Sequence, residues 1–229
     1  MRWVTLTLAF AIAWTPVLAA DANTKTAERL DDSASLFSEI MSTPDRAIPQ
    51  ELLERANCVV LVPALKKAAF GVGGKYGRGF AICRGADGTG WGPPAAIRIE
   101  GGSIGLQIGV SSTDVVMLIM NQRGMKRLSA SKFTIGADAA AAAGPVGRSA
   151  AAQTDAFVSA EILSYSRSKG LFAGISLDGA TLRNDLDENE ILYGQRWTSK
   201  QILGSGAKMP EAASKLVAVL NKYSMRERK

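Results

Sequence analysis

Short runs of β-type residues, separated by glycine-rich segments, fill the middle of the chain and constrain its fold most strongly. Runs of this kind joined by glycine turns are typical of antiparallel hairpins. We expect turns at 73–77, 85–88 and 101–103. The strands expected around these turns are 58–63, 68–73, 78–84, 95–100, 104–110 and 114–120. An antiparallel meander is the simplest sheet that joins them.

The pattern becomes less regular after residue 120. A short helix or turn is expected at 124–128, and further strands at 132–143, 155–165, 172–177 and 180–183. Alanines 139–143 favour a helix by propensity. However, glycines on both sides leave too few residues for a stable isolated helix, so we expect a strand there.

Helical patterns flank the β-rich region. An apolar stripe at helical spacing occurs in an acidic N-terminal stretch, and Pro49 is suited to open a second helix that ends near Asn57. Pro210 similarly opens a C-terminal helix, expected over 210–225. The stripe residues are Leu30, Ala34, Phe37 and Met41 in the first helix, and Ala213, Leu216, Val217 and Leu220 in the last.

These elements predict an α+β fold: an antiparallel β-rich meander or partly closed barrel, with N-terminal and C-terminal helices packed on it. We expect a single domain over residues 23–229, because a chain of 229 residues can bury one substantial core.

Residues 1–20 have the pattern of a secretory signal peptide. Arg2 supplies a positive charge, residues 3–14 are apolar, and small residues after Pro16 offer cleavage points at 19, 20 and 22. The apolar stretch is short for a membrane span, although an uncleaved anchor is the alternative. We therefore expect an exported protein, periplasmic or secreted, that associates peripherally with a membrane.

Cys58 and Cys83 are the chain's two cysteines. In an oxidising compartment they are candidates for a disulfide, which would stabilise the fold by about 3 to 4 kcal/mol in the chain-entropy model. Two buried free thiols are the alternative, because sequence cannot show whether the two Cα atoms are close enough.

The absence of histidine excludes Ser/His/Asp and Cys/His catalysis and imidazole metal sites. We expect no enzyme activity, no metal and no cofactor. Residues 71–76 fail as a nucleotide loop, because Tyr76 stands where Ser or Thr is needed. The acidic residues Asp185, Asp187, Glu188 and Glu190 lack calcium-loop spacing, so a solvated acidic turn is favoured.

Positive charge is concentrated between residues 58 and 148. This region has eleven basic and four acidic residues, a balance of +7 within a net charge of +6 for the whole chain. Such a surface suits an anionic partner, although basic residues also serve simply to solubilise turns. Nucleic acid is disfavoured, because no aromatic ladder accompanies the basic residues.

Several ordered segments resemble the SYLF lipid-binding domain. They are residues 67–74, 101–109, 114–116 with 120–121, 144–148 and 162–179, within a resemblance that covers about 30–205. The resemblance implies a non-enzymatic module that binds phospholipid head groups, phosphoinositides in eukaryotic members, with fungal relatives that also bind and bundle actin. Eukaryotic members use a basic N-terminal helix at the membrane, whereas residues 23–57 here carry four basic and seven acidic residues.

We therefore expect the basic turns, rather than that helix, to contact anionic phospholipid. The predicted phosphate contacts are Lys66, Lys67, Lys75, Arg78, Arg148, Arg167 and Lys169. Leu171 and Phe172 are predicted to dip into the acyl boundary, with burial inside a strand as the stronger alternative for this pair. The competing functions are a structural protein that docks an envelope partner, an actin-binding-like module by family analogy and, least supported, a lipid-acting enzyme.

Overall fold

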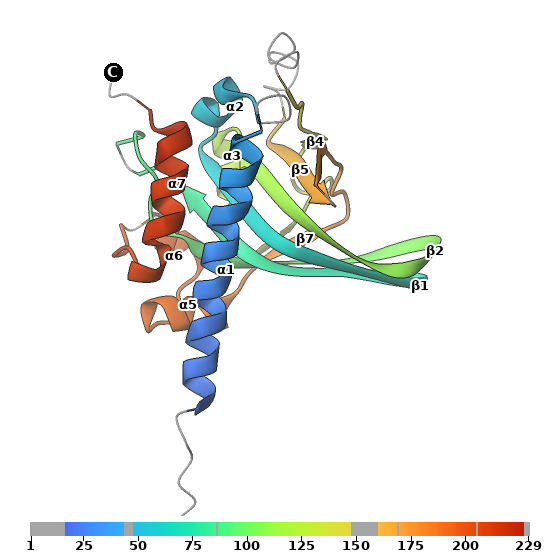
Figure 1. Cartoon of the computed structure of the whole chain (residues 1–229), viewed down its shortest axis with the longest axis horizontal. Coiled ribbons are helices and arrows are strands. Elements are labelled where there is room, and N and C mark those ends of the chain that lie inside the picture. Colours follow the sequence, from blue (N-terminus) through green and yellow to red (C-terminus); the bar gives the residue numbers. More distant parts are fainter. Residues whose placement is uncertain are drawn as a thin grey trace, which may run out of the picture.

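The structure is a computed structural model that describes residues 17–43, 48–85, 87–147, 160–168, 170–204 and 206–226 (Figure 1). The described helices are α1 (Val17–Met41), α2 (Gln50–Arg55), α3 (Gln122–Leu128), α5 (Leu186–Tyr193), α6 (Ser199–Gly204), the 3₁₀ helix η2 (Glu211–Ala213) and α7 (Ser214–Ser224). The described strands are β1 (Cys58–Cys83), β2 (Ala95–Ile119), β3 (Lys132–Thr134), β4 (Ala141–Ala143), β5 (Ile162–Ser168), β6 (Leu171–Gly174) and β7 (Thr181–Asn184).

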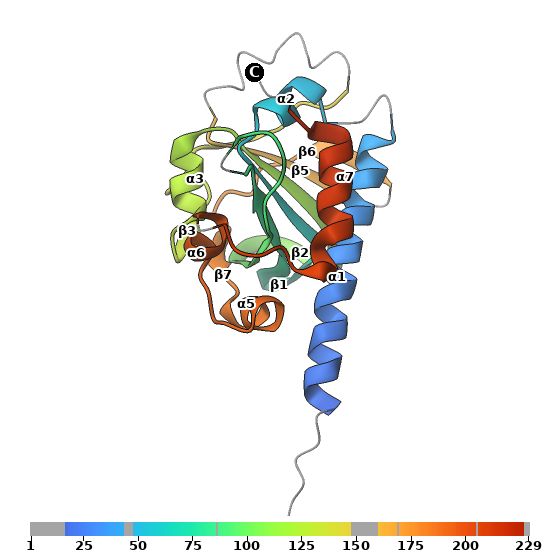
Figure 2. The same ribbon diagram turned by 90° about the vertical axis from the view of Figure 1, so that its left-hand side faces the viewer.

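These strands form one curled sheet in the order β3-β7-β2-β5-β4, with β1 paired to β2 and β6 paired to β5. All pairs are antiparallel except β4 with β5, which run parallel. The helices near both ends of the chain, α1, α2 and α7, cover the sheet (Figures 1 and 2). The predicted α+β class, with a partly closed sheet and packed terminal helices, is confirmed.

Two very long strands replace the six short ones expected between residues 58 and 120. The turns predicted at 73–77 and 101–103 are wrong, because these residues continue β1 and β2 and pair with each other, as in Gly74 opposite Gly102. Glycine permits a turn but does not require one, and a partner strand supplies the hydrogen bonds that keep the backbone extended. The chain reverses instead between residues 83 and 95, which include the turn predicted at 85–88.

The β1–β2 ribbon bends sharply near the middle of both strands. Phe70 lies opposite Ile108 and Val72 opposite Ile104, so one residue of β1 faces three residues of β2 at this point. Such an irregularity bends a ribbon. The ribbon consequently folds back, and in Figure 1 both arms of β1 and both arms of β2 meet at a tip that projects away from the helices.

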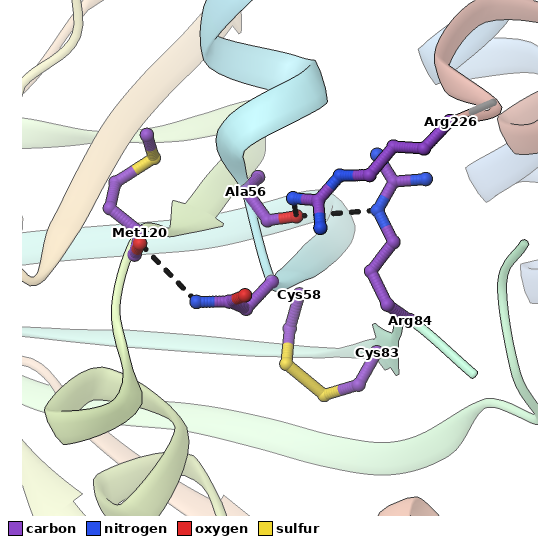
Figure 3. The surroundings of a disulfide bond; sticks show 7 residues. Ala56, Cys58, Cys83, Arg84, Met120 and Arg226 are labelled. Carbon is purple, nitrogen blue, oxygen red and sulfur yellow. Dashed lines mark hydrogen bonds between the residues drawn. A yellow bond between two sulfur atoms is a disulfide. The ribbon is translucent and has the colours of Figure 1, made fainter. Parts of the chain in front are cut away.

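The two arms of β1 pack directly against each other. At Gly79 an added Cβ would lie 2.0 Å from the Leu61 carbonyl oxygen, so no larger residue fits without moving backbone. The disulfide between Cys58 and Cys83 joins the two ends of β1 where the arms meet (Figure 3). Of the two alternatives for these cysteines, the structure therefore contains the disulfide and not two free thiols.

Arg84 fastens the helices to the sheet beside this disulfide. Its guanidinium donates to the carbonyl oxygens of Leu53 (3.0 Å), in α2, and of Ser224 (2.5 Å), at the end of α7. It also donates to the Ala56 carbonyl at 3.4 Å (Figure 3) and lies over the Trp91 ring. Burial lowers the pKa of Arg84 to about 10, so it stays protonated near neutral pH.

Alternating side chains divide the interior into two cores, one on each face of the sheet. Even-numbered residues of the first arm of β1, such as Val60, face an inner core closed by α3, β3 and β7. Odd-numbered neighbours, such as Val59 and Leu61, face the core beneath α1, α2 and α7. Leu30, Ala34 and Phe37 of the predicted α1 stripe are buried there, and so are Ala213, Leu216, Val217 and Leu220 of the C-terminal stripe.

The later β segments are shorter than predicted. The strand expected at 132–143 consists of β3, a turn with Gly136 at φ 85°, and β4, because a left-handed residue interrupts extended pairing. The strands expected at 172–177 and 180–183 correspond to β6 and β7. In the segment expected at 155–165, residues 155–159 lie outside the described residues, and β5 covers Ile162–Ser168.

Gly79→Ala is expected to lower the free energy of unfolding by about 2 to 3 kcal/mol, because the methyl group would force the arms of β1 apart. Urea unfolding followed by circular dichroism would measure the change. Gly102→Ala is the matched control, since no atom lies within 4 Å of a Cβ built there. Equal losses for the two variants would contradict the close packing of the arms.

Candidate functional site

A groove of about 310 Å³ lies between α1 and the two arms of β1. Its polar lining comes from four α1 side chains and from Lys66, Tyr76 and Arg78 of β1. The α1 residues are Lys25, Glu28, Arg29 and Asp32, whose spacing of three and four places them along one helix face. Two segments of β1 that are ten residues apart border one groove because the ribbon folds back.

A bulge in β1 turns Lys66 toward this groove. The register shifts between Val62 and Leu65, and Ala64 adopts a left-handed φ of 52°. The Ala64 N–H donates to Asp114 Oδ1 at 2.9 Å, which offsets part of the cost of that backbone conformation. As a result Leu65 is buried in the inner core, while Lys66 is exposed beside the groove.

Two buried carboxylates lie behind the groove and hold its arginines. Arg78 donates from Nε to Asp185 Oδ2 (2.6 Å) and from Nη2 to Asp185 Oδ1 (2.8 Å), a bidentate pair. Arg29 of α1 pairs with Glu188 of α5. Asp185 and Glu188 are fully buried. Burial raises the pKa of Glu188, while the positive charges of Arg29 and Arg78 act in the opposite direction.

This arrangement corrects the interpretation of the acidic segment as a solvated turn. Asp185 and Glu188 are internal partners of arginines, and only Asp187 and Glu190 lie at the surface, where both pair with Arg196. It also changes the role of Arg78, whose charge is compensated inside the protein. Arg78 therefore links β1 to the segment that begins α5, and its guanidinium group is not free to bind a phosphate.

Arg167 is also paired with carboxylates of the protein. Its guanidinium donates to Asp114 Oδ2 at 2.9 Å and also pairs with Glu39 of α1. A second groove of about 380 Å³ contains this trio together with Ser112, Ser168 and Gly170. With two carboxylates around one arginine, this groove does not favour an anion.

Lys67 and Lys75 lie on adjacent arms of β1 near the ribbon tip. The Lys75 side chain passes over Gly101 and donates from Nζ to the Asp178 carbonyl oxygen at 3.4 Å. Burial and, after it, the charge of Lys67 lower the pKa of Lys75, while Asp178 opposes this shift. Lys67 is exposed. Neither Lys66 nor Lys67 forms an ion pair with any side chain in the described ranges.

The two residues predicted to contact the membrane, Leu171 and Phe172, differ in their exposure. Leu171 is 63% exposed, but Phe172 is 9% exposed and stacks on Tyr165 with ring centroids 5.4 Å apart. For Phe172 the structure therefore contains the stronger alternative, burial within a strand, because its ring is part of the core under α1. The two remaining predicted phosphate contacts, Arg148 and Lys169, lie outside the described residues.

Sequence reasoning missed the α1 contribution to the groove and the exposed Tyr76. The only signal for the former was the helical spacing of Lys25 and Arg29. Within the described ranges, no group of His, Cys, Asp or Glu side chains is arranged to hold a metal ion. None of the described helices is long and apolar enough to cross a membrane.

The fold and the site define an α+β module in which a curled sheet presents cations on a folded-back ribbon. The sequence model described as "Ysc84: Las17-binding protein actin regulator" matches residues 100–223. The chain is also 36% identical over 179 residues to Protein YSC84 of Saccharomyces cerevisiae, which covers 77% of this chain and 38% of that protein. This chain belongs to the Ysc84 family, which confirms the resemblance to the SYLF domain.

Two further relatives are named for binding partners or additional domains. LAS seventeen-binding protein 3 of Saccharomyces cerevisiae is 36% identical over 179 residues, covering 77% of this chain and 39% of that protein. SH3 domain-containing YSC84-like protein 1 of Homo sapiens is 31% identical over 191 residues, covering 82% of this chain and 55% of that protein. The chain thus spans between about two fifths and just over half of the length of these relatives.

Proposed function

We propose that this chain binds anionic phospholipid head groups at a membrane surface and catalyses no reaction. The observation that carries the proposal is the placement of Lys66, Lys67 and Lys75 on the folded-back ribbon, where the first two have no carboxylate partner among the described side chains. Each lysine near an anionic membrane contributes on the order of 1 kcal/mol, so these three support reversible, peripheral binding.

The arginines play a structural part in this proposal. Because Arg78 and Arg167 are paired with carboxylates of the protein itself, they hold the ribbon and α1 in place rather than bind phosphate. Lysine ammonium groups bind phosphate as mobile point charges, which suits a laterally mobile membrane better than one fixed ligand geometry. The leader-like residues 1–20 support an exported protein that meets the outer face of a membrane.

Lys66→Gln with Lys67→Gln is expected to weaken binding to anionic vesicles about 30-fold, from the loss of two cations. Flotation with phosphatidylglycerol-containing vesicles at low salt would measure it. Lys200→Gln with Lys208→Gln is the matched control, because both lysines are exposed and α6 and the segment after it lie away from the ribbon tip (Figures 1 and 2). Equal loss in both variants, or equal binding to neutral vesicles, would refute the proposal.

A second candidate is a protein-docking module, favoured by the names of the Las17-binding relatives. For an exported chain the corresponding partner would be an envelope protein. A pull-down that recovers one stoichiometric protein partner with or without lipid, together with no vesicle binding, would favour this candidate over the lipid proposal.

A further inference from the structure

The ribbon tip, defined as residues 68–74 of β1 and 101–113 of β2, contains no charged residue. It follows Lys67 and precedes Lys75 on β1, and on β2 it is bordered by Glu100 and Asp114. Figure 1 shows that the apex of the ribbon, where β1 and β2 bend, extends away from the helices and from the rest of the sheet. An uncharged segment in so prominent a position needs a physical explanation, because projecting loops and ribbon ends are usually polar.

The register places apolar residues at paired positions of the tip. Phe70 lies opposite Ile108 and Val72 opposite Ile104. Leu106 is the middle residue of the three that face Gly71 at the bend, so it occupies the apex of the ribbon. Ala68 lies opposite Val110, next to the pair formed by Lys67 and Ser111.

The Val110 side chain on this segment is 82% exposed. Single exposed apolar residues are common and carry little information. Val110 differs because it belongs to a segment without charge, in which eight of the 20 residues are hydrophobic and seven are glycine, and which begins directly beside two exposed lysines. An exposed apolar side chain on an uncharged segment with adjacent cations fits the pattern of interfacial membrane anchors.

We propose that the ribbon tip inserts into the head-group and upper acyl region of an anionic bilayer, with Lys66 and Lys67 at the level of the phosphates. This inference rests on the proposed function and adds the orientation of the protein on the membrane. Gly71 at the bend is four residues beyond Lys67, or about 13 Å along a strand, which suits shallow insertion. Deep insertion is disfavoured, since a ribbon edge has backbone groups without partners in hydrocarbon.

Charge favours a bilayer over a second copy of this chain as the partner of the ribbon tip. Two tips that met would bring Lys66, Lys67 and Lys75 of each copy close together, and like charges oppose such a contact. An anionic bilayer offers apolar material to the apex and phosphates to the lysines at the same time. The bilayer is therefore the partner that satisfies both features of the tip.

Site-specific fluorescence tests the insertion. The disulfide occupies both native cysteines, so under non-reducing conditions a Val110→Cys variant takes the environment-sensitive fluorophore NBD at one position. With phosphatidylglycerol-containing vesicles we expect a blue shift and a severalfold rise in emission. Leu106→Cys is a second labelling position at the apex, and Ala212→Cys, exposed in η2, is the control for which no change is expected.

The outcomes separate this inference from the proposed function. Flotation of the labelled protein without any spectral change at 106 or 110 would overturn insertion and leave head-group binding intact. Absence of flotation by the unlabelled protein would overturn both. A blue shift without vesicles that grows with protein concentration would show tip-to-tip pairing and overturn the inference.

A neutral substitution supplies an independent measurement. Val110→Gln is expected to weaken vesicle binding about threefold to tenfold, because it removes an apolar group from the acyl boundary without changing charge. Unchanged vesicle affinity of this variant, together with no spectral response at Leu106→Cys, would overturn the inference.

Discussion

Reducing the Cys58–Cys83 disulfide is expected to lower the free energy of unfolding by about 3 to 4 kcal/mol. The two cysteines are 25 residues apart, and the cross-link restricts a loop of that size in the unfolded chain. In the folded state the bond joins the two ends of β1, where the arms of the strand meet. Urea unfolding with and without dithiothreitol would measure the effect.

The control for this experiment is the variant with Cys58→Ala and Cys83→Ala. Dithiothreitol should leave its stability unchanged, and the variant should be at least as unstable as the reduced protein, because both positions are buried. A loss below about 1 kcal/mol on reduction would show that packing between the arms alone holds the ribbon closed.

Asp185→Ala is expected to cost about 3 to 5 kcal/mol, the range for removing one partner of a buried ion pair. Asp185 accepts two hydrogen bonds from Arg78, and as the N-cap of α5 it also accepts one from the Glu188 N–H at 3.3 Å. The substitution removes all three and leaves Arg78 beside Glu188 alone. Thermal or urea unfolding would measure the loss.

Asp187→Ala is the matched control, since it lies in the first turn of the same helix with its side chain 65% exposed, paired only with Arg196 in the described structure. Surface pairs of this kind contribute about 0 to 1 kcal/mol. Similar losses for the two aspartates would mean that the carboxylates behind the groove contribute no more than surface charges.

Local patterns in the sequence predicted the parts of the fold that depend on neighbouring residues. Helical spacing identified the buried faces of α1 and α7, and the composition of residues 58–120 identified extended chain. The number of strands was wrong, because a glycine-rich segment is compatible with both a turn and a bent strand. The choice depends on whether a partner strand lies beside it, which local sequence does not show.

The candidate site was predictable to a similar degree. The sequence identified Lys66, Lys67 and Lys75 as cations in a glycine-rich segment, and the structure places them on the folded-back ribbon. It could not show that Arg78 and Arg167 are compensated. Their partners Asp185, Glu39 and Asp114 are 107, 128 and 53 residues away along the chain.

The amino-acid sequence by itself determined the extended character of residues 58–120, the excess of positive charge and the lack of any imidazole, since these are properties of single residues and near neighbours. Only the tertiary structure decided which of the described cations are paired with carboxylates and which are not, and that β1 doubles back so that its ends meet at a disulfide. The physical reason is that electrostatic compensation and backbone packing depend on distances in space, which residues far apart in the chain acquire only when it folds.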